Sequence, residues 1–248
     1  MPHQTFTLDE VADYLRVEPR HIERLVRDRE IPFSVRGGRM VFRRGEIDTW
    51  ASQRLLGQPD HGIEWYHRKT WPGARRAFPE GALIPALLRQ EWIEPQLAAK
   101  TKPSVIREMV ALAERTGHVL DARELRASLE SRQALSSTAL PGGLALLHAQ
   151  QQQPYLYEDS FIVLGRTVQA VPFGAPDGLP TRLFFLICCQ DEHIHLHVLA
   201  RLCLLGLRTD IIVRLLEAPQ GASMYDALVA AEQSVLPGGR NAGKAVPV

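Results

Sequence analysis

The stretch SSTALPGGLALLHA (residues 136–149) decides how the second half of the chain folds. A hydroxyl cluster leads into a Pro-Gly-Gly turn, and four apolar residues then run to a single histidine, His148. The apolar run predicts a buried strand over 144–149, and the glycines allow the backbone to approach another group closely. A histidine at the end of such a strand offers one ring nitrogen to a reactant while the protein holds the other. On residue type alone, a core histidine bonded to a neighbour is the more ordinary interpretation.

Helical and sheet-like segments alternate on both sides of this stretch. We expect one helix over 103–116 and a second that is capped by Asp121 and ends at about residue 132. Three further helices should begin at about residues 193, 209 and 223, and strands should lie at 161–166 and 183–189. The run at 183–189 is apolar throughout, which indicates a central strand covered on both faces. These segments predict an α/β domain over 82–236, with a mixed sheet and helices on both of its sides. The Gly-rich tail, 237–248, is expected to be disordered.

Length and composition place the chain among ordinary soluble proteins. It has 248 residues, of which 45% are apolar and 23% charged. No apolar run is long enough to span a bilayer, and no signal segment opens the chain, so we expect a cytoplasmic protein without membrane insertion. The three cysteines lie in apolar surroundings and fit reduced core thiols better than a disulfide framework.

The net charge of +1 hides two regions of opposite sign. Residues 20–44 hold eight arginines and three acidic residues, a local charge of +5, whereas 82–236 hold 13 basic and 16 acidic residues, a local charge of −3. This separation indicates two modules with different partners.

The first module, residues 1–56, begins with two short predicted helices. Thr7 and Glu10 form a capping-box pattern at the first helix, and Pro19 stands where the first turn of the second tolerates proline. Three arginines of the second helix follow at i, i+4 and i+7 and form an outward basic stripe: Arg20, Arg24 and Arg27. Two helices joined by a tight turn, with this stripe on the second, are typical of a helix-turn-helix.

A hairpin and a third helix complete the module. Gly37-Gly38 lies between two β-prone runs, with Arg36 and Arg39 at the tip, followed by a helix whose inner face includes Trp50. This order resembles the winged-helix excisionase and MerR-like DNA-binding domains. The resemblance implies that Arg20, His21 and Arg24 read the major groove and that the two hairpin arginines hold phosphates. The alternative is a solvated face used for protein contact; the module's net charge of only +1 predicts modest, salt-sensitive DNA affinity.

Residues 57–81 read as a linker. Turn-forming residues at 57–62 mark its start, and 65–78 interleave aromatics with four basic residues. We interpret this segment as a connector whose aromatics pack on a flanking domain; added contacts to nucleic acid are the lesser alternative.

Six motifs in order along the second module carry a family resemblance. They are KPSVIREM (102–109), SST (136–138), GGLALLHA (142–149), PFGAPDG (172–178), LFFLI (183–187) and HLHVLARL (195–202). This sequence looks like the mannitol/fructose/nitrogen-type IIA domain of the bacterial phosphoenolpyruvate:sugar phosphotransferase system. Two positions depart from the family pattern: Leu147 replaces a usual proline, and Gln133 replaces a usual glutamate.

The resemblance implies that His148 accepts a phosphoryl group from the phosphocarrier HPr or its paralogue, with His195 beside it. Arg132, His195 and the hydroxyls of Ser136 and Thr138 are the candidates to hold the phosphoryl oxygens. A neutral imidazole is a competent nucleophile at pH 7. The motif calls for neither a metal nor a cofactor.

A competing motif lies at residues 193–199, where three histidines alternate with apolar residues. His193, His195 and His197 also fit the histidine-triad pattern of nucleotide hydrolases and transferases, in which a strand would place all three on one face. The surrounding spacing fits a helix start better than a strand. A metal site made by the first and third of these histidines lacks an obvious third ligand.

Together these features predict a transcription regulator that binds double-stranded DNA and senses an HPr-like phosphocarrier through phosphorylation of His148, provided that its imidazole is accessible. The alternative is a catalytic IIA component that passes phosphate to a IIB protein. A homodimer, the operator and the identity of the carrier are left open by the sequence.

Overall fold

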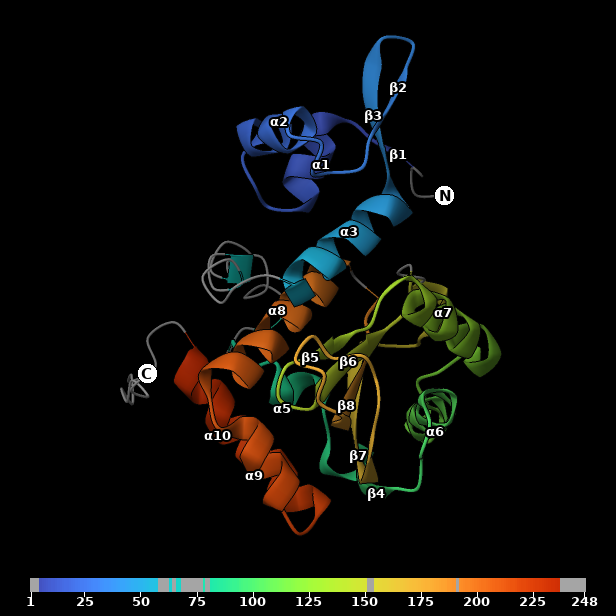
Figure 1. The fold of residues 1–248 in the computed structure, drawn as a ribbon, viewed down its shortest axis with the longest axis vertical. Coiled ribbons are helices and arrows are strands. Elements are labelled where there is room, and N and C mark those ends of the chain that lie inside the picture. Colours follow the sequence, from blue (N-terminus) through green and yellow to red (C-terminus); the bar gives the residue numbers. More distant parts are fainter. Residues whose placement is uncertain are drawn as a thin grey trace.

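The computed structural model describes residues 5–57, 63, 66–67, 78, 81–150, 154–190 and 192–236. Figure 1 shows two bodies of secondary structure, a small one at the N-terminal end and a larger one built around a sheet. The tail at 237–248 and most of the linker lie outside the described residues.

The small body has the expected helix-turn-helix and hairpin. Its elements are β1 (Thr5–Phe6), α1 (Leu8–Tyr14), α2 (Pro19–Arg27), β2 (Ser34–Arg36), β3 (Arg39–Arg43) and α3 (Arg44–Gly57). The capping box is confirmed: Glu10 N donates to Thr7 Oγ1, and Thr7 N donates to the Glu10 carboxylate. The strand β1 was not predicted, because two residues give no periodicity; it pairs antiparallel with β3 and makes the order β1-β3-β2.

The larger body contains the remaining elements. They are α5 (Ile84–Leu87), the 3₁₀ turns η1 (Gln90–Trp92) and η2 (Pro154–Leu156), β4 (Ile93–Leu97), α6 (Lys102–Glu114), α7 (Ala122–Leu135), β5 (Ala139–Leu140), β6 (Leu144–His148), β7 (Phe161–Val171), β8 (Thr181–Cys188), α8 (Glu192–Arg208), α9 (Ile211–Glu217) and α10 (Gly221–Val235). The predicted cap of α7 is confirmed, since Asp121 accepts a hydrogen bond from Glu124 N.

The sheet is mixed and lies between two helical layers. Its order is β4-β7-β8-β6-β5; β8 runs parallel to β6 and antiparallel to β7. In Figure 1, α6 and α7 cover one face, while α8, α9 and α10 lie on the other. The apolar strand β8 is central and almost wholly buried, as its composition predicted. The predicted α/β fold is therefore correct.

The strand β7 extends five residues past the predicted end at Arg166. In the sequence Arg166 follows the apolar run and therefore predicts the end of the strand, yet the structure buries its side chain. Its guanidinium donates to the carbonyls of Pro95, Leu215 and Ala218 at 2.7–3.0 Å. The carbonyls at the end of α9 thus stabilise a buried cation that sequence periodicity treats as a breaker.

Two glycines set the entry of β6. Gly142 and Gly143 have φ of +87° and +91°, and a Cβ on the first would lie 3.1 Å from Ile212 Cδ1. The carbonyl of Gly143 accepts hydrogen bonds from the backbone N–H groups of Arg182 and Leu183. The Pro-Gly-Gly turn therefore joins β5 to β6 in a conformation that other residues adopt only with strain.

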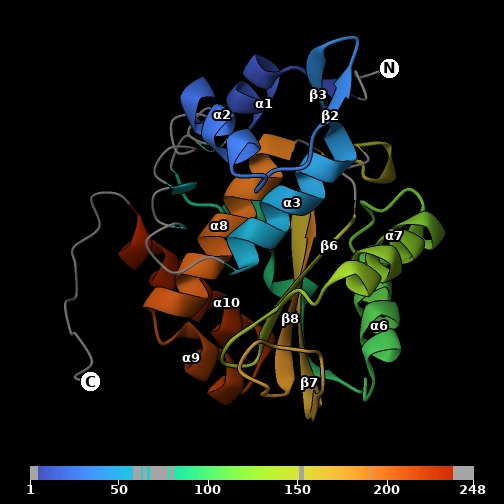
Figure 2. The ribbon, with the colours of Figure 1, turned by 45° about the horizontal axis from the view of Figure 1, so that its top comes forward.

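The two bodies pack against each other through α3 and α8. Figure 2 shows α3 crossing α8 next to the end of β6. At this boundary Gln53 Nε2 donates to Ser136 Oγ at 3.2 Å. The small body thus lies over the end of the sheet at which β6 finishes with His148.

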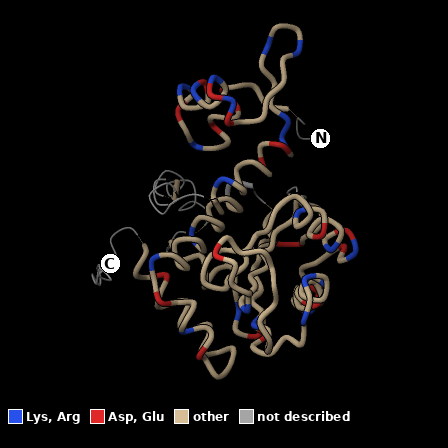
Figure 3. The backbone as a smooth tube through the Cα atoms, in the orientation of Figure 1, with Lys and Arg blue, Asp and Glu red and all other residues tan. Residues whose placement is uncertain are grey.

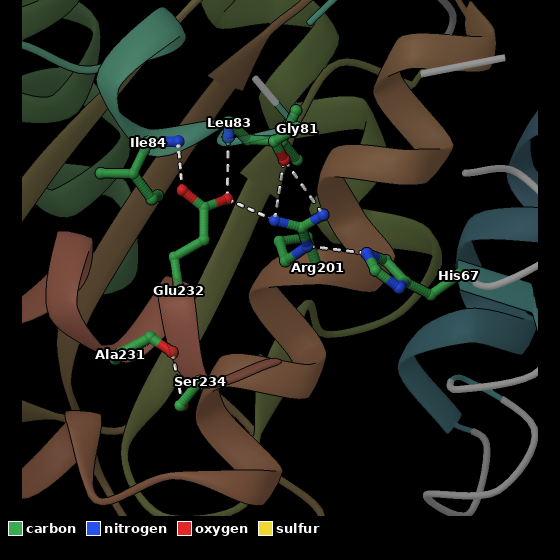
Figure 4. Close-up of polar contacts among 8 residues, drawn as sticks. All are labelled: His67, Gly81, Leu83, Ile84, Arg201, Ala231, Glu232 and Ser234. Atoms are coloured by element: carbon green, nitrogen blue, oxygen red, sulfur yellow. Dashed lines mark hydrogen bonds and ion pairs between the residues drawn. The ribbon is translucent and has the colours of Figure 1, made fainter. Parts of the chain in front are cut away.

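One described linker residue, His67, is anchored inside the larger body. Figure 4 shows that Arg201 of α8 donates through Nε to His67 Nε2 at 2.7 Å and forms an ion pair with Glu232 of α10. The same carboxylate accepts the backbone N–H groups of Leu83 and Ile84, at 2.8 and 3.0 Å. The chain leaving α3 is therefore fixed to α8 before the sheet begins.

Two further features follow from the described residues. Cys188, Cys189 and Cys203 are buried and form no disulfide, in agreement with reduced core thiols. None of the described helices is both long and apolar enough to cross a membrane.

Candidate functional site

His148 is held at the end of β6 by contacts at both ring nitrogens. Arg132 Nε, from the last turn of α7, donates to His148 Nε2 at 3.1 Å. Because Nε2 accepts this bond, Nδ1 carries the hydrogen and donates to the carbonyl of Leu146 at 2.9 Å. The ring is fixed in one tautomer, with the lone pair of Nε2 directed toward the guanidinium.

The start of α8 brings the second histidine to the first. The ring centroids of His148 and His195 lie 5.2 Å apart, with the planes tilted by 53°. Burial and the charge of Arg132 lower the pKa of His195 to about 3, and the same two causes with His195 itself hold the pKa of His148 well below its usual range. Both imidazoles are therefore neutral at pH 7.

Two buried nitrogen atoms of the residues that contact His148 make no hydrogen bond to any described residue. Arg132 Nη2 and His195 Nδ1 have no hydrogen-bond partner within the described part of the chain. Burial lowers the pKa of Arg132 only to about 10, so its guanidinium stays charged at neutral pH. Buried donors without partners are costly, and such groups often face an absent ligand. A cation and an imidazole that flank a nucleophilic nitrogen suit the oxygens of a transferred phosphoryl group.

The predicted hydroxyls take different places. Ser136 lies at the guanidinium, where Arg132 Nη1 donates to its Oγ and to its carbonyl, each at 3.1 Å. Thr138 is fully buried, and its Oγ1 accepts from Gln133 Nε2. Ser136 thus orients Arg132. The contact described for the Thr138 hydroxyl is instead to Gln133.

A small cavity of about 10 Å³, room for roughly one water molecule, adjoins the two histidines. The larger body contributes His148, Ala149, Gln150, His195 and Leu196 to its wall, and the small body contributes Tyr14, Asp48 and Ser52. The imidazole of His148, which the sequence-based prediction required to be accessible, is only 2% exposed. The expectation of an accessible imidazole is therefore wrong, and three of the residues beside His148 at this cavity belong to the helix-turn-helix body.

The closing residues include a buried acid. Asp48 of α3 is 9% exposed, and its Oδ1 accepts a hydrogen bond from the Tyr14 hydroxyl of α1. Burial raises the pKa of Asp48 to about 6, against the opposing effects of the Tyr14 hydrogen bond and Arg44. The pKa of this carboxyl therefore lies much closer to neutral pH than that of an exposed aspartate, and the carboxyl lines the same cavity as the phosphoryl-acceptor candidate.

The histidine-triad interpretation does not hold. Positions 193, 195 and 197 all lie in the helix α8, not in a strand. In a helix the first and third are one turn apart, and the middle one points to a different side. The His197 ring instead stacks on His67, with centroids 4.6 Å apart. Among the described residues no group of three or more histidine, cysteine or acidic side chains is arranged to hold a metal.

The residues predicted to bind DNA belong to the small body, which lies away from the sheet (Figures 1 and 3). The side chains of Arg20, Arg24 and Arg27 are exposed on α2, and those of Arg36 and Arg39 flank the hairpin turn. His21 differs: it is half-buried, lines an apolar cavity with Trp50 and contacts Arg24 Nη2 through Nδ1 at 3.1 Å. The five arginines form a surface that the larger body leaves open.

Sequence reasoning missed the residues that close the site: Tyr14, Asp48, Ser52 and Gln53. One signal was available, since Asp48 and Ser52 are polar residues four apart on a helix. That pattern is indistinguishable from a solvated face without knowledge of what packs on it.

Comparisons with known proteins agree with this division of the chain. The family model described as "Phosphoenolpyruvate-dependent sugar phosphotransferase system, EIIA 2" matches residues 86–230, and a helix-turn-helix domain model matches residues 5–55. The chain is 30% identical over 147 residues to the fructose-specific EIIABC component of the phosphotransferase system of Bacillus subtilis (strain 168). That match covers 58% of this chain and only 23% of the relative.

Solved structures show the same fold. The nitrogen regulatory protein IIA-Ntr from Neisseria meningitidis has a TM-score of 0.54 and 26% identity, over 59% of this chain and 99% of that one. The IIA mannitol protein from Escherichia coli, with a TM-score of 0.50 and 22% identity over 57% of this chain and 98% of that one, shares the fold. The chain belongs to the EIIA 2 family of the phosphoenolpyruvate-dependent sugar phosphotransferase system, with a helix-turn-helix domain joined to its N-terminal side.

Proposed function

We propose that this protein is a DNA-binding transcription regulator whose IIA domain accepts a phosphoryl group on His148 from an HPr-like phosphocarrier. The phosphorylation state of His148 would set how the helix-turn-helix domain docks on the IIA domain, and through this docking it would alter DNA binding. Cytoplasmic location follows from such a donor.

The chemical step needs little from the protein besides alignment and charge. The lone pair of His148 Nε2 attacks the phosphorus of the carrier's phosphohistidine, a P–N bond forms, and the carrier's imidazole leaves with the electrons of the broken P–N bond. Arg132 exchanges its bond to Nε2 for a bond to a phosphoryl oxygen. The Nδ1–H bond to the Leu146 carbonyl keeps the ring oriented throughout.

The observation that carries this proposal is a pair of buried nitrogen atoms near the nucleophile without hydrogen bonds to the described residues: Arg132 Nη2 is a donor, and His195 Nδ1 is a donor in the tautomer that carries its hydrogen there. Arg132 Nη2 and His195 Nδ1 are buried beside His148 and have no partner in the described part of the chain. Three phosphoryl oxygens would satisfy both atoms, whereas a purely structural histidine would require neither.

Coupling to the DNA-binding domain follows from steric exclusion. The cavity of about 10 Å³ admits one water but not a phosphoryl group with its carrier. Phosphorylation therefore requires that Tyr14, Asp48 and Ser52 move away. By linkage, whatever stabilises the docked state opposes phosphorylation, and phosphorylation opposes docking by the same free energy.

The test measures labelling and DNA binding on one preparation. The protein is incubated with labelled phosphoenolpyruvate, the general phosphotransferase enzyme and HPr, and its affinity for its own upstream DNA is measured before and after. We expect label in the wild type and in a His118→Ala control, no label in His148→Ala, and a changed affinity only where label enters. Label that persists in His148→Ala would contradict the site, and an affinity unaffected by full labelling would contradict the coupling.

A second candidate function is a catalytic IIA component that passes the phosphoryl group to a IIB protein. The curated relative that matches is itself a fructose-specific EIIABC component, and the histidine pair and its arginine are all present here. In that case label would leave His148 on addition of a IIB protein, and no upstream DNA would bind. The resemblance to both fructose and nitrogen proteins leaves the sugar-type and nitrogen-type carriers as donors to be compared in the same assay.

A further inference from the structure

The wall of the His148 cavity contains a feature that neither DNA binding nor phosphoryl acceptance requires. Asp48 comes from the helix-turn-helix domain, is 9% exposed and lines the same cavity as His148 and His195. Its Oδ1 accepts a hydrogen bond from the hydroxyl of Tyr14, which lies on the helix α1. A carboxylate buried at a domain boundary costs free energy unless hydrogen bonds and opposite charges compensate it.

Modification of His148 would change the charges around the cavity. Arg132 contacts the imidazole of His148, whereas Arg44 acts on the Asp48 carboxyl from within its own domain. A phosphoryl group adds up to two negative charges and three oxygens at Nε2. The added charge would lie in a closed space with the carboxylate of Asp48, and their repulsion favours separation of the domains.

We propose that Asp48, held by Tyr14, is the group through which the helix-turn-helix domain detects phosphorylation of His148: the carboxylate is repelled by the phosphoryl group and the domain is released. This inference rests on the proposed function of His148 and names the residue that converts its modification into movement. Asp48 is a positioning residue, since it acts through the docked interface and touches no reacting atom.

The substitution Asp48→Asn tests the charge with almost no change in shape, because the amide oxygen still accepts from the Tyr14 hydroxyl. Asp13→Asn is the matched control: Asp13 is an exposed acid on α1, and its loss changes the net charge of the same domain equally. Docking is followed in the full chain by energy transfer between dyes on Val35→Cys and Leu120→Cys, two side chains that are each 63% exposed. The three native cysteines are buried and resist labelling.

The phosphoryl donor in this experiment is phosphoramidate, which is small and releases ammonia as the P–N bond to His148 forms. We expect phosphorylation to lower the docked-to-released ratio about tenfold in the wild type and in Asp13→Asn, as for an ordinary coupling between sites. Asp48→Asn should reach the same stoichiometry of label and lower this ratio only about threefold, because steric exclusion from the small cavity still acts in the variant while the charge repulsion is gone.

A second variant keeps the inference testable if Asp48→Asn alters docking by itself. Tyr14→Phe retains the carboxylate but removes its hydrogen bond, so release on phosphorylation should equal or exceed that of the wild type. Release in Asp48→Asn equal to wild type, or release in Tyr14→Phe smaller than wild type, would overturn the role of Asp48 while leaving His148 as the acceptor. Failure of every variant to take up label would instead overturn the proposed function.

Discussion

At the scale of single residues, the site depends on histidines that the fold keeps neutral. Burial and neighbouring arginines lower the pKa of His195 and of His197 to about 3 and that of His67 to about 2. In His148 this keeps a lone pair on Nε2 at neutral pH, which nucleophilic attack requires. Arg132 contributes in two ways: it helps to hold the imidazoles neutral and it presents an unused donor.

The same shifts predict how stability depends on pH. An unfolded histidine binds a proton near pH 6.5, whereas the folded, buried ring does not, so the unfolded state takes up more protons below that pH. The free energy of unfolding should be unaffected by these residues above about pH 7 and should fall by about 1.4 kcal/mol per pH unit for each buried histidine as pH drops from 6 to 5.

Urea unfolding of the wild type and of His197→Phe, followed between pH 6 and pH 5, measures this contribution. Phenylalanine retains a ring that stacks on His67 but cannot take up a proton. The pH slope should be smaller by about 1.4 kcal/mol per pH unit in the variant, whatever its overall stability. Equal slopes in the two proteins would mean that His197 titrates alike in the folded and unfolded states.

At the scale of secondary-structure elements, the sequence predicted most of what the structure contains. Capping at Thr7 and Asp121, the apolar run of β8 and the Gly-Gly hairpin each specify a local conformation with few alternatives. The wrong end of β7 shows where this reasoning fails. Arg166 is buried by carbonyls from β4 and α9, which lie far from it in the sequence, so no local pattern could reveal that the strand continues.

The hairpin between β2 and β3 carries the prediction about DNA. Arg36 and Arg39 flank the turn at the tip of the hairpin, and the hairpin extends away from the larger body (Figure 3), so both residues are placed where phosphate contacts are possible. Replacing both by glutamine should weaken binding about equally for specific and unrelated DNA and should reduce the slope of log affinity against log salt by about 2. A titration at several salt concentrations measures this slope.

The matched control for that titration removes two exposed arginines from the IIA domain, with Arg115→Gln and Arg126→Gln. This variant has the same net charge as the hairpin variant and should retain the wild-type slope. An equal loss of slope in both variants would show that overall charge, and not the hairpin, attracts DNA.

At the scale of the whole molecule, the central feature is that the helix-turn-helix domain lines the cavity at His148, the proposed phosphoryl acceptor of the IIA domain. The sequence predicted His148, His195 and Arg132 because their motifs lie within one family pattern. It could not predict that Tyr14, Asp48 and Ser52 would close the cavity, because docking depends on the match between two surfaces about 100 residues apart in the chain. The anchoring of His67 on Arg201 was hidden for the same reason.

This arrangement makes the rate of phosphorylation a measure of domain docking. Ser52 is 3% exposed on α3 and faces the cavity, so Ser52→Trp would overfill the interface and favour release of the helix-turn-helix domain. Glu46→Trp, at an exposed position of the same helix, adds an equal side chain away from the interface and serves as the control.

The most direct test is the initial rate at which the phosphorylated HPr-type carrier labels His148 in these full-length proteins. If the helix-turn-helix domain covers the acceptor, Ser52→Trp should be labelled about tenfold faster than the wild type and Glu46→Trp, and His148→Ala should take up no label. Labelling of the wild type at the same rate as Ser52→Trp would contradict the account, because the domain would then present no barrier to the carrier.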